Sequence, residues 1–301
     1  MAQSLRRKID YDELAKLAFA SKPGAGGITL VPYFDGERTP NRPNATATFS
    51  GMTLANTTRE NLARAFVEGL LCSQRDCLEL IRSLGASITR ILLTAADRAD
   101  GADAIINTLK KQDIKGAFFF TGEFYELYPD VVQRLLKEGH YVGSHSYGHL
   151  LYSPWGNRDS LLVTREEFEK DLLKSYEVMR KAGIEFKDAP LYIPPYEYYN
   201  RQIAAWAKNM GIQVVNFTAG TASNADYTTP DMKNYRSSQA IYDKILSVEA
   251  AEGLNGHLML IHFGTDARRT DKFYKGHLER LIKVLKNKGY KFVPLREAVG
   301  I

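Results

Sequence analysis

Two histidines separated by three residues, His145 and His149, are the part of this 301-residue chain whose chemistry is easiest to name. They belong to the stretch HSYGH, which follows an apolar run typical of a buried strand. If the chain turns helically there, the i, i+4 spacing places both imidazoles on one face. Two neutral imidazoles on one face can reach the same divalent metal at about 2.0–2.1 Å. The sequence therefore predicts a metal site at this strand end.

Other polar side chains follow predicted strands in the same way. Asp97 comes after the run ITRILLT, Tyr196 and Glu197 come after PLYIPPY, and His262 ends the run HLMLIH. The C-terminal ends of barrel strands share one rim, where active sites lie, so we expect these groups to meet there. Structural roles remain open: Asp97 could cap a helix, and His262 could be a core histidine.

Strand-like and helix-like segments alternate along the second part of the chain, which demands parallel strands joined by right-handed crossovers. The pattern predicts an α/β fold, a distorted seven-stranded (β/α) barrel over residues 88–301. The predicted strands are 88–94, 116–121, 141–146, 190–196, 213–218, 257–264 and 290–295. The predicted helices are 102–111, 129–138, 164–182, 200–210, 238–252 and 274–288.

Residues 1–87 follow a different pattern, which predicts a separate α+β domain. A short amphipathic helix over 9–20 precedes strands over 27–34 and 47–54, and a long helix covers 58–84. The stretch Thr57-Thr58-Arg59-Glu60 has the form of a capping box that would open the long helix.

Composition excludes two classes of partner. The net charge is +5, but 40 Lys and Arg are interleaved with 35 Asp and Glu, so we expect no nucleic-acid partner. No apolar run is long enough to span a membrane, so we expect no membrane partner. The N-terminus, MAQSLRRKID, lacks the apolar segment of a signal peptide, which predicts a cytoplasmic location for the chain as written.

Residues 97–301 resemble the polysaccharide deacetylases of carbohydrate esterase family four, which have the NodB-homology fold. The histidine motif is matched by His145 and His149, the proline-tyrosine motif by Pro194-Pro195-Tyr196, and the final histidine motif by Leu260-Ile261-His262. The longer stretches GSHSYGHLLYSPWGNRDSLLVT and HFGTDARRTDKFY resemble a Bacteroidetes-type branch, whose members often act in the periplasm or outside the cell.

The resemblance implies metal-assisted removal of an N- or O-acetyl group from a glycan or oligosaccharide. It implies a divalent metal of the Zn, Co or Ni class, held by Asp97, His145 and His149. The metal would polarise the acetyl carbonyl and acidify a water molecule. His262 would be the acid toward the leaving group, and the backbone amide of Tyr196 would help to stabilise the oxyanion. The candidate substrate-binding residues are Tyr147, Trp155, Tyr198 and Asp226.

The first motif departs from the family pattern. Family members carry two aspartates where this chain reads Thr94-Ala95-Ala96-Asp97, so alanine stands at the position of the usual base. A neighbouring carboxylate could replace it, with Glu197, Asp100 and Asp226 as candidates. The alternative to a weakly active enzyme is therefore an inactive barrel, which either binds glycans or only folds.

Residues 11–94 resemble another family, the FGGY carbohydrate kinases, and within it the C-terminal domain of xylulokinases, which has an actin-like (ribonuclease H-like) fold. The marks are the loop GERTP at 36–40 and the stretch GMTL at 51–54. The glycine-rich nucleotide loop expected after ITRILLT is missing, so kinase activity is not expected. We therefore interpret the chain as a chimera, engineered or recombined, with a shared strand at 88–94 and a seam near 94–100.

Overall fold

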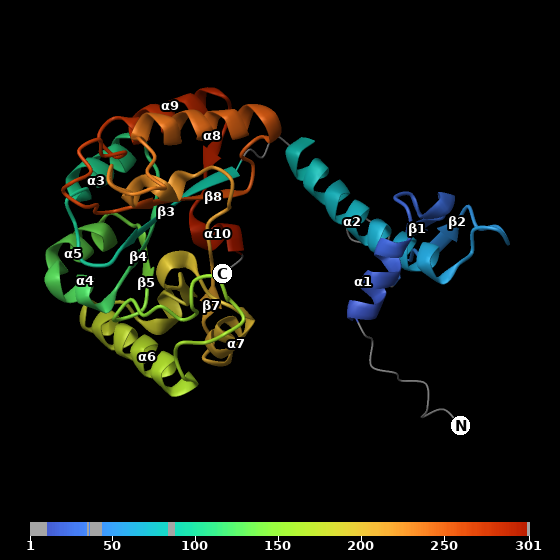
Figure 1. The fold of residues 1–301 in the computed structure, drawn as a ribbon. Helices are drawn as coiled ribbons and strands as arrows, with labels where there is room; N and C mark the ends of the chain where they lie inside the picture. Colours follow the sequence, from blue (N-terminus) through green and yellow to red (C-terminus); the bar gives the residue numbers. More distant parts are fainter. Residues whose placement is uncertain (1–10, 35, 37–43, 84–87, 300–301) are drawn as a thin grey trace. The chain divides into compact units, whose positions relative to one another are not determined.

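The computed structural model describes residues 11–34, 36, 44–83 and 88–299. Its internal contacts divide the chain into two compact units, Met1–Ala86 and Ser87–Ile301. Figure 1 draws the first unit from blue to cyan and the second from teal to red. Within the described residues, no helix is long and apolar enough to cross a membrane.

The first unit is a small α+β structure. Its elements are α1 (Tyr11–Ala20), η1 (Ala25–Gly27), β1 (Thr29–Val31), β2 (Thr48–Ser50) and α2 (Arg59–Ser83). The antiparallel pair β1–β2 places Leu30 opposite Phe49. Helix α2 crosses this pair so closely that a Cβ at Gly69 would lie 2.6 Å from the Leu30 carbonyl oxygen, which explains the glycine within the helix.

The start of α2 differs from the prediction. The helix begins at Arg59, and the Thr58 hydroxyl accepts a hydrogen bond from the Asn61 amide at 3.2 Å. The Thr57 hydroxyl instead donates to the Thr53 carbonyl at 2.6 Å. The predicted capping box was therefore wrong: Thr58 caps the helix, the residue three positions later is Asn61, and the preceding turn occupies the Thr57 side chain.

The second unit is built on a curled parallel sheet. Its strands are β3 (Ile88–Ala95), β4 (Ala117–Phe120), β5 (Tyr141–Ser144), β6 (Leu191–Tyr192), β7 (Gln213–Val214), β8 (His257–His262) and β9 (Lys291–Phe292). They follow the order β7-β6-β5-β4-β3-β8, with β9 also paired to β3. The amide of Thr218, just after β7, donates to the Leu258 carbonyl in β8 at 2.9 Å, which draws the two sides of the sheet together. This half-barrel confirms the predicted fold class.

Helices connect these strands and cover the sheet (Figure 1). They are α3 (Ala102–Lys111), α4 (Gly122–Leu127), α5 (Pro129–Lys137), α6 (Arg165–Lys181), α7 (Arg201–Asn209), α8 (Ser238–Glu252), α9 (His277–Asn287) and α10 (Leu295–Val299). Helix α6 opens with the predicted capping box, in which Thr164 and Glu167 each bond the other's backbone amide. Helices α4 and α10 are too short to produce a periodic signal and were not predicted.

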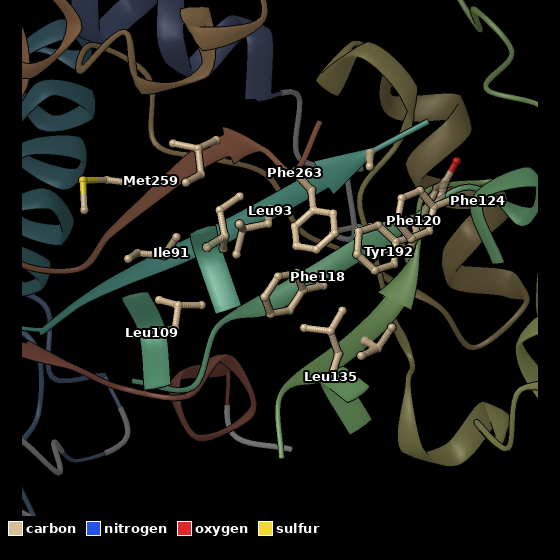
Figure 2. Packing of buried hydrophobic residues seen from close by; sticks show 14 of the residues in the cluster. Ile91, Leu93, Leu109, Phe118, Phe120, Phe124, Leu135, Tyr192, Met259 and Phe263 are labelled. Atoms are coloured by element: carbon tan, nitrogen blue, oxygen red, sulfur yellow. The ribbon is translucent and has the colours of Figure 1, made fainter. Parts of the chain in front are cut away.

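Aromatic side chains pack between the sheet and the helices that cover it. Strand β4 is buried along its whole length, and Phe118 and Phe120 pack against Phe263 with ring centroids 5.5 and 5.2 Å apart (Figure 2). Burying a side chain of this size contributes about 1.5–3 kcal/mol. This packing fixes the C-terminal ends of β4 and β8, and therefore the rim at which the candidate site lies.

Candidate active site

His145 and His149 meet at the end of β5. The His145 ring is 2% exposed, and its Nδ1 lies 2.7 Å from the Ile193 carbonyl oxygen. Since a carbonyl only accepts, Nδ1 carries the proton and Nε2 presents its lone pair. That Nε2 lies 3.2 Å from Nε2 of His149. Two ligands at about 2.0–2.1 Å from a tetrahedral ion stand roughly 3.3 Å apart, so the pair fits a shared metal.

The two rings are not presented by a helix, which corrects the expectation drawn from their spacing. The chain after β5 is irregular, and both Ser146 (φ 71°) and His149 (φ 54°) have left-handed backbone conformations. The amide of His149 donates to the Ser146 hydroxyl at 3.0 Å. A tight loop brings the two imidazoles together instead. In this loop, the short polar side chain of Ser146 accepts the hydrogen bond that a backbone carbonyl would accept in a helix.

The surroundings keep both imidazoles neutral. Burial, followed by the charge of His149, lowers the pKa of His145 well below its usual value. Burial, followed by the charge of His262, lowers the pKa of His149 to about 4. Neutral imidazole is the state that binds a metal, so the pair is ready to accept an ion at neutral pH.

Asp97, the third expected ligand, does not join the pair in a ligand set. Its side chain is 61% exposed, and its Oδ1 lies 3.8 Å from Nε of Arg98. Over the part of the chain that the structure describes, no three His, Cys, Asp or Glu side chains are grouped to hold a metal ion. The geometry of the histidine pair fits a metal ion, whereas the aspartate that completes the family's ligand set, Asp97, is not grouped with the pair.

Glu197 brings a different carboxylate to the histidines. Its side chain is 11% exposed, and its Oε1 lies 3.9 Å from His145 Nε2. Tyr196 and Glu197 both have positive φ, 59° and 53°, a conformation disfavoured for side chains of this kind that turns the chain sharply after Pro195. Burial raises the pKa of Glu197 to about 7, with His262 opposing and Asp226 reinforcing that rise.

The Glu197 carboxylate is largely buried, and its 3.9 Å approach to the neutral His145 ring is too long for a hydrogen bond. Burying a carboxylate is costly. Such a cost is expected where the group serves chemistry rather than stability.

His262 is paired with a buried carboxylate, so it is not a simple core histidine. Its Nδ1 lies 2.7 Å from Oδ1 of Asp226, and its backbone amide donates to Oδ2 at 2.9 Å. Burial lowers the pKa of His262, but the Asp226 charge and hydrogen bond outweigh burial, so the pKa stands above its usual value. Asp226, 1% exposed in η4 (Ser223–Tyr227), therefore orients the ring and favours its protonated form.

Aromatic rings lie on both sides of these groups. On one side the Tyr196 ring, 45% exposed, lies 4.4 Å from the His149 ring, and Trp155, 62% exposed, lies 5.6 Å from Tyr196. The Tyr198 ring follows, 4.8 Å from Trp155. On the other side, the Tyr227 ring lies 5.2 Å from the His262 ring.

Two other tyrosines are packing residues. Tyr147 donates to Glu126 at 3.0 Å and lies under the Lys174 ammonium, so its ring is held against α4 and α6. Tyr152 is fully buried and shares a hydrogen bond with Tyr192. Of the aromatic residues around the site, Trp155, Tyr196 and Tyr227 therefore have exposed rings, whereas Tyr147 and Tyr152 pack against the protein.

A parallel half-barrel with histidines and carboxylates at its C-terminal rim can support metal-assisted hydrolysis, among other chemistries. Residues 88–215 match the polysaccharide deacetylase family, and residues 1–94 match the C-terminal domain of the FGGY family of carbohydrate kinases. A match to polysaccharide deacetylases therefore adjoins a match to FGGY kinases on this chain, and the two matches overlap on β3.

Individual proteins agree with both assignments. A peptidoglycan-N-acetylglucosamine deacetylase of Bacillus cereus is 27% identical over 193 residues, which are 64% of this chain and 60% of the relative. The xylulose kinase of Haemophilus influenzae is 44% identical over 85 residues, 28% of this chain and 17% of the kinase. The solved structure of BA3943, a CE4 family pseudoenzyme from Bacillus anthracis, is 18% identical, with a TM-score of 0.56 over 71% of this chain and 66% of its own.

Proposed function

We propose that the second unit is a metal-dependent deacetylase that hydrolyses an N- or O-acetyl group on a glycan or oligosaccharide. The observation that carries the proposal is the convergence of a neutral histidine pair, a largely buried carboxylate and a histidine–aspartate pair. His262 is near enough to both His149 and Glu197 for its charge to shift their pKa values. Related deacetylases named for peptidoglycan support the choice of an acetylated glycan as substrate.

Each group has a separate role in this proposal. The Nε2 atoms of His145 and His149 hold a divalent metal, which when bound polarises the acetyl carbonyl and lowers the pKa of water. Glu197 takes the position of the missing base and accepts the proton of the attacking water. Zinc, cobalt and nickel all suit imidazole ligands, which favour these metals over magnesium or calcium.

The remaining groups handle the leaving group and the substrate. His262, held in orientation by Asp226, donates a proton to the nitrogen or oxygen that leaves the acetyl carbon. The backbone amide of Tyr196 stabilises the oxyanion. The exposed rings of Trp155 and Tyr196 stack on sugar rings beside the acetyl group.

The test is acetate release from acetylated chito-oligosaccharides with Zn²⁺ or Co²⁺ present. Glu197→Gln keeps the shape of the side chain but cannot accept the proton, so we expect a loss of roughly 10²–10⁴-fold in kcat. The amount of bound metal should be unchanged. Glu185→Gln, an exposed carboxylate in the same unit, is the matched control. Equal rates for the Glu197 variant and the unsubstituted protein would contradict the assignment of the base.

A second candidate function is a barrel without turnover that retains glycan binding. Ala96 at the position of the family's usual base and the junction of two families within β3 favour it. The same assay separates the two: metal and chito-oligosaccharide binding with no acetate released would establish the binding protein.

A further inference from the structure

We infer that Asp171 of α6 is a positioning residue for the histidine pair: its carboxylate holds the loop between His145 and His149 in the shape that turns both Nε2 atoms toward one ion. The inference rests on the proposed function, in which this pair holds a metal. Asp171 was not a candidate in the sequence, because a polar residue on an amphipathic helix has the pattern of a solvated face.

The contact is bidentate and directed at the loop's backbone. Oδ2 of Asp171 accepts from the amide of Tyr147 at 3.0 Å, and Oδ1 accepts from the amide of Gly148 at 2.9 Å. Both amides lie between the two histidines in the sequence. Hydrogen bonds to an ionised acceptor are stronger than those between neutral groups, so this clamp restrains the loop more than two hydroxyl contacts would.

Serine side chains complete the arrangement. The amide of Ser146 donates to the Ser144 hydroxyl at 3.1 Å, and the His149 amide donates to the Ser146 hydroxyl at 3.0 Å. With the two bonds to Asp171, all four amides from 146 to 149 have a side-chain acceptor. The Ser144 hydroxyl is itself bonded to Ser175 at 2.8 Å. Ser175 lies one helical turn after Asp171, so a single face of α6 supports the loop.

The loop needs this support because it is not a conformation that the chain prefers. Ser146 and His149 have positive φ values, which are uncommon for residues other than glycine. Gly148 lies close to the same carboxylate, since a Cβ there would be in tight contact with Oδ1 of Asp171 at 3.2 Å. A loop that lacks the hydrogen bonds of a helix or sheet keeps one conformation only if other groups, such as side chains, accept hydrogen bonds from its amides.

The first test is Asp171→Asn, which preserves size but replaces one acceptor oxygen with an NH₂ group that faces a backbone N–H. Glu177→Gln, an exposed carboxylate on the same helix, is the matched control. In the metal-free protein we expect faster amide hydrogen exchange over residues 144–150 in Asp171→Asn only. For Zn²⁺, titration calorimetry should show an affinity roughly 10–100-fold weaker, as for other residues that support metal ligands.

A second variant keeps the inference testable if Asp171→Asn fails to fold. Gly148→Ala leaves Asp171 in place but pushes a methyl group against its carboxylate, so exchange and zinc affinity should change in the same direction by a smaller factor. Unchanged exchange and unchanged zinc affinity in a folded variant would overturn the inference. If the unsubstituted protein bound no zinc, the proposed function would fail, and the exchange comparison alone would decide the role of Asp171.

Discussion

The ends of β5 and β3 lie on the same rim but differ in how well they are organised. After β5, the loop that carries His145 and His149 has its amides bonded from 146 to 149 and is supported by α6. β3 ends at Ala95, and the chain then passes through Ala96 to an Asp97 whose side chain is 61% exposed. The proposed site therefore has an organised histidine half at the end of β5, and its carboxylate must come from a segment other than β3.

Glu197 is the group that lies in the right place to supply it. It comes from the segment after β6, not from β3, and its carboxylate faces His145 from a strained backbone. In the proposed site, the base therefore comes from a different strand end than in the family pattern.

The largest effect is expected for His145→Ala, which removes a metal ligand. Zinc affinity should fall by more than the roughly 10–100-fold typical of supporting residues. Asp97→Asn should change zinc affinity little, because the aspartate does not reach the histidine pair. Titration calorimetry of both variants checks the comparison. Similar losses in the two would show that the end of β3 is as functional as the end of β5.

The difference between the ends of β3 and β5 can also be tested by restoring the family's carboxylate after β3. In a Glu197→Gln background, Ala96→Asp places an aspartate where family members carry the base, so we expect part of the roughly 10²–10⁴-fold loss in acetate release to be recovered. Ala96→Asn in the same background is the matched control and should recover nothing. An equal rate in both double variants would mean that β3 no longer presents its side chains to the site.

A change in pH dependence is expected for Asp226→Asn. Burial lowers the pKa of His262, Asp226 raises it above the usual value, Glu197 adds to the rise and Arg269 opposes it. The acid acts only while protonated, so without the Asp226 charge the alkaline limb of the kcat/KM profile should move to lower pH. Profiles of both proteins at saturating zinc check this, and an unmoved limb would argue against His262 as the acid.

The same shift has a consequence for stability. Because the folded pKa of His262 is raised, the contribution of its pair with Asp226 is present below the pKa of the unfolded chain and is lost as pH rises through the folded value. Asp226→Asn should therefore lower the free energy of unfolding more at acidic than at alkaline pH, as long as the native carboxylate stays ionised. Urea unfolding at both ends of this range measures the difference.

The smallest effect is expected for Trp155→Ala. Loss of one stacking ring costs about 0.5–1.5 kcal/mol, which is a factor of roughly 2–10 in affinity. KM for oligosaccharides should rise by that factor, while kcat and zinc affinity stay unchanged. Trp206→Phe, at the buried second tryptophan, is the control and should leave KM unaltered. A fall in kcat for Trp155→Ala would place the ring in the reaction itself.

The strand–helix alternation of the second unit was predictable from the sequence because its helices and strands carry strong apolar patterns. Strand β4, AFFF, is buried throughout, as its composition indicates. The short helices were not predicted, because six-residue α4 and five-residue α10 have too few turns to show a helical periodicity of apolar residues. In the first unit, the cap of α2 was placed at the wrong threonine because two candidates are adjacent.

The sequence could predict which strand-end residues form the candidate site, but not the backbone conformation or the directions of their side chains. The spacing of His145 and His149 indicated neighbouring rings, yet it indicated a helix where the chain forms a loop with positive φ values. Nothing in a local pattern could show that Glu197 faces inward while Asp97 faces solvent, because both follow strands. The role of Asp171 depends on the packing of α6 beside β5, which is a tertiary property.

Strand β3 pairs with β8 over residues 89–94, with β4 over residues 92–95 and with β9 at residues 88 and 89, through main-chain atoms that are the same in every residue. A sheet therefore accepts a strand from another protein if the size and polarity of its side chains fit, and a segment that matches two families can meet this condition. Strands of this kind are places where genes can be joined without losing the fold, provided that the loop after the strand is not what performs the chemistry.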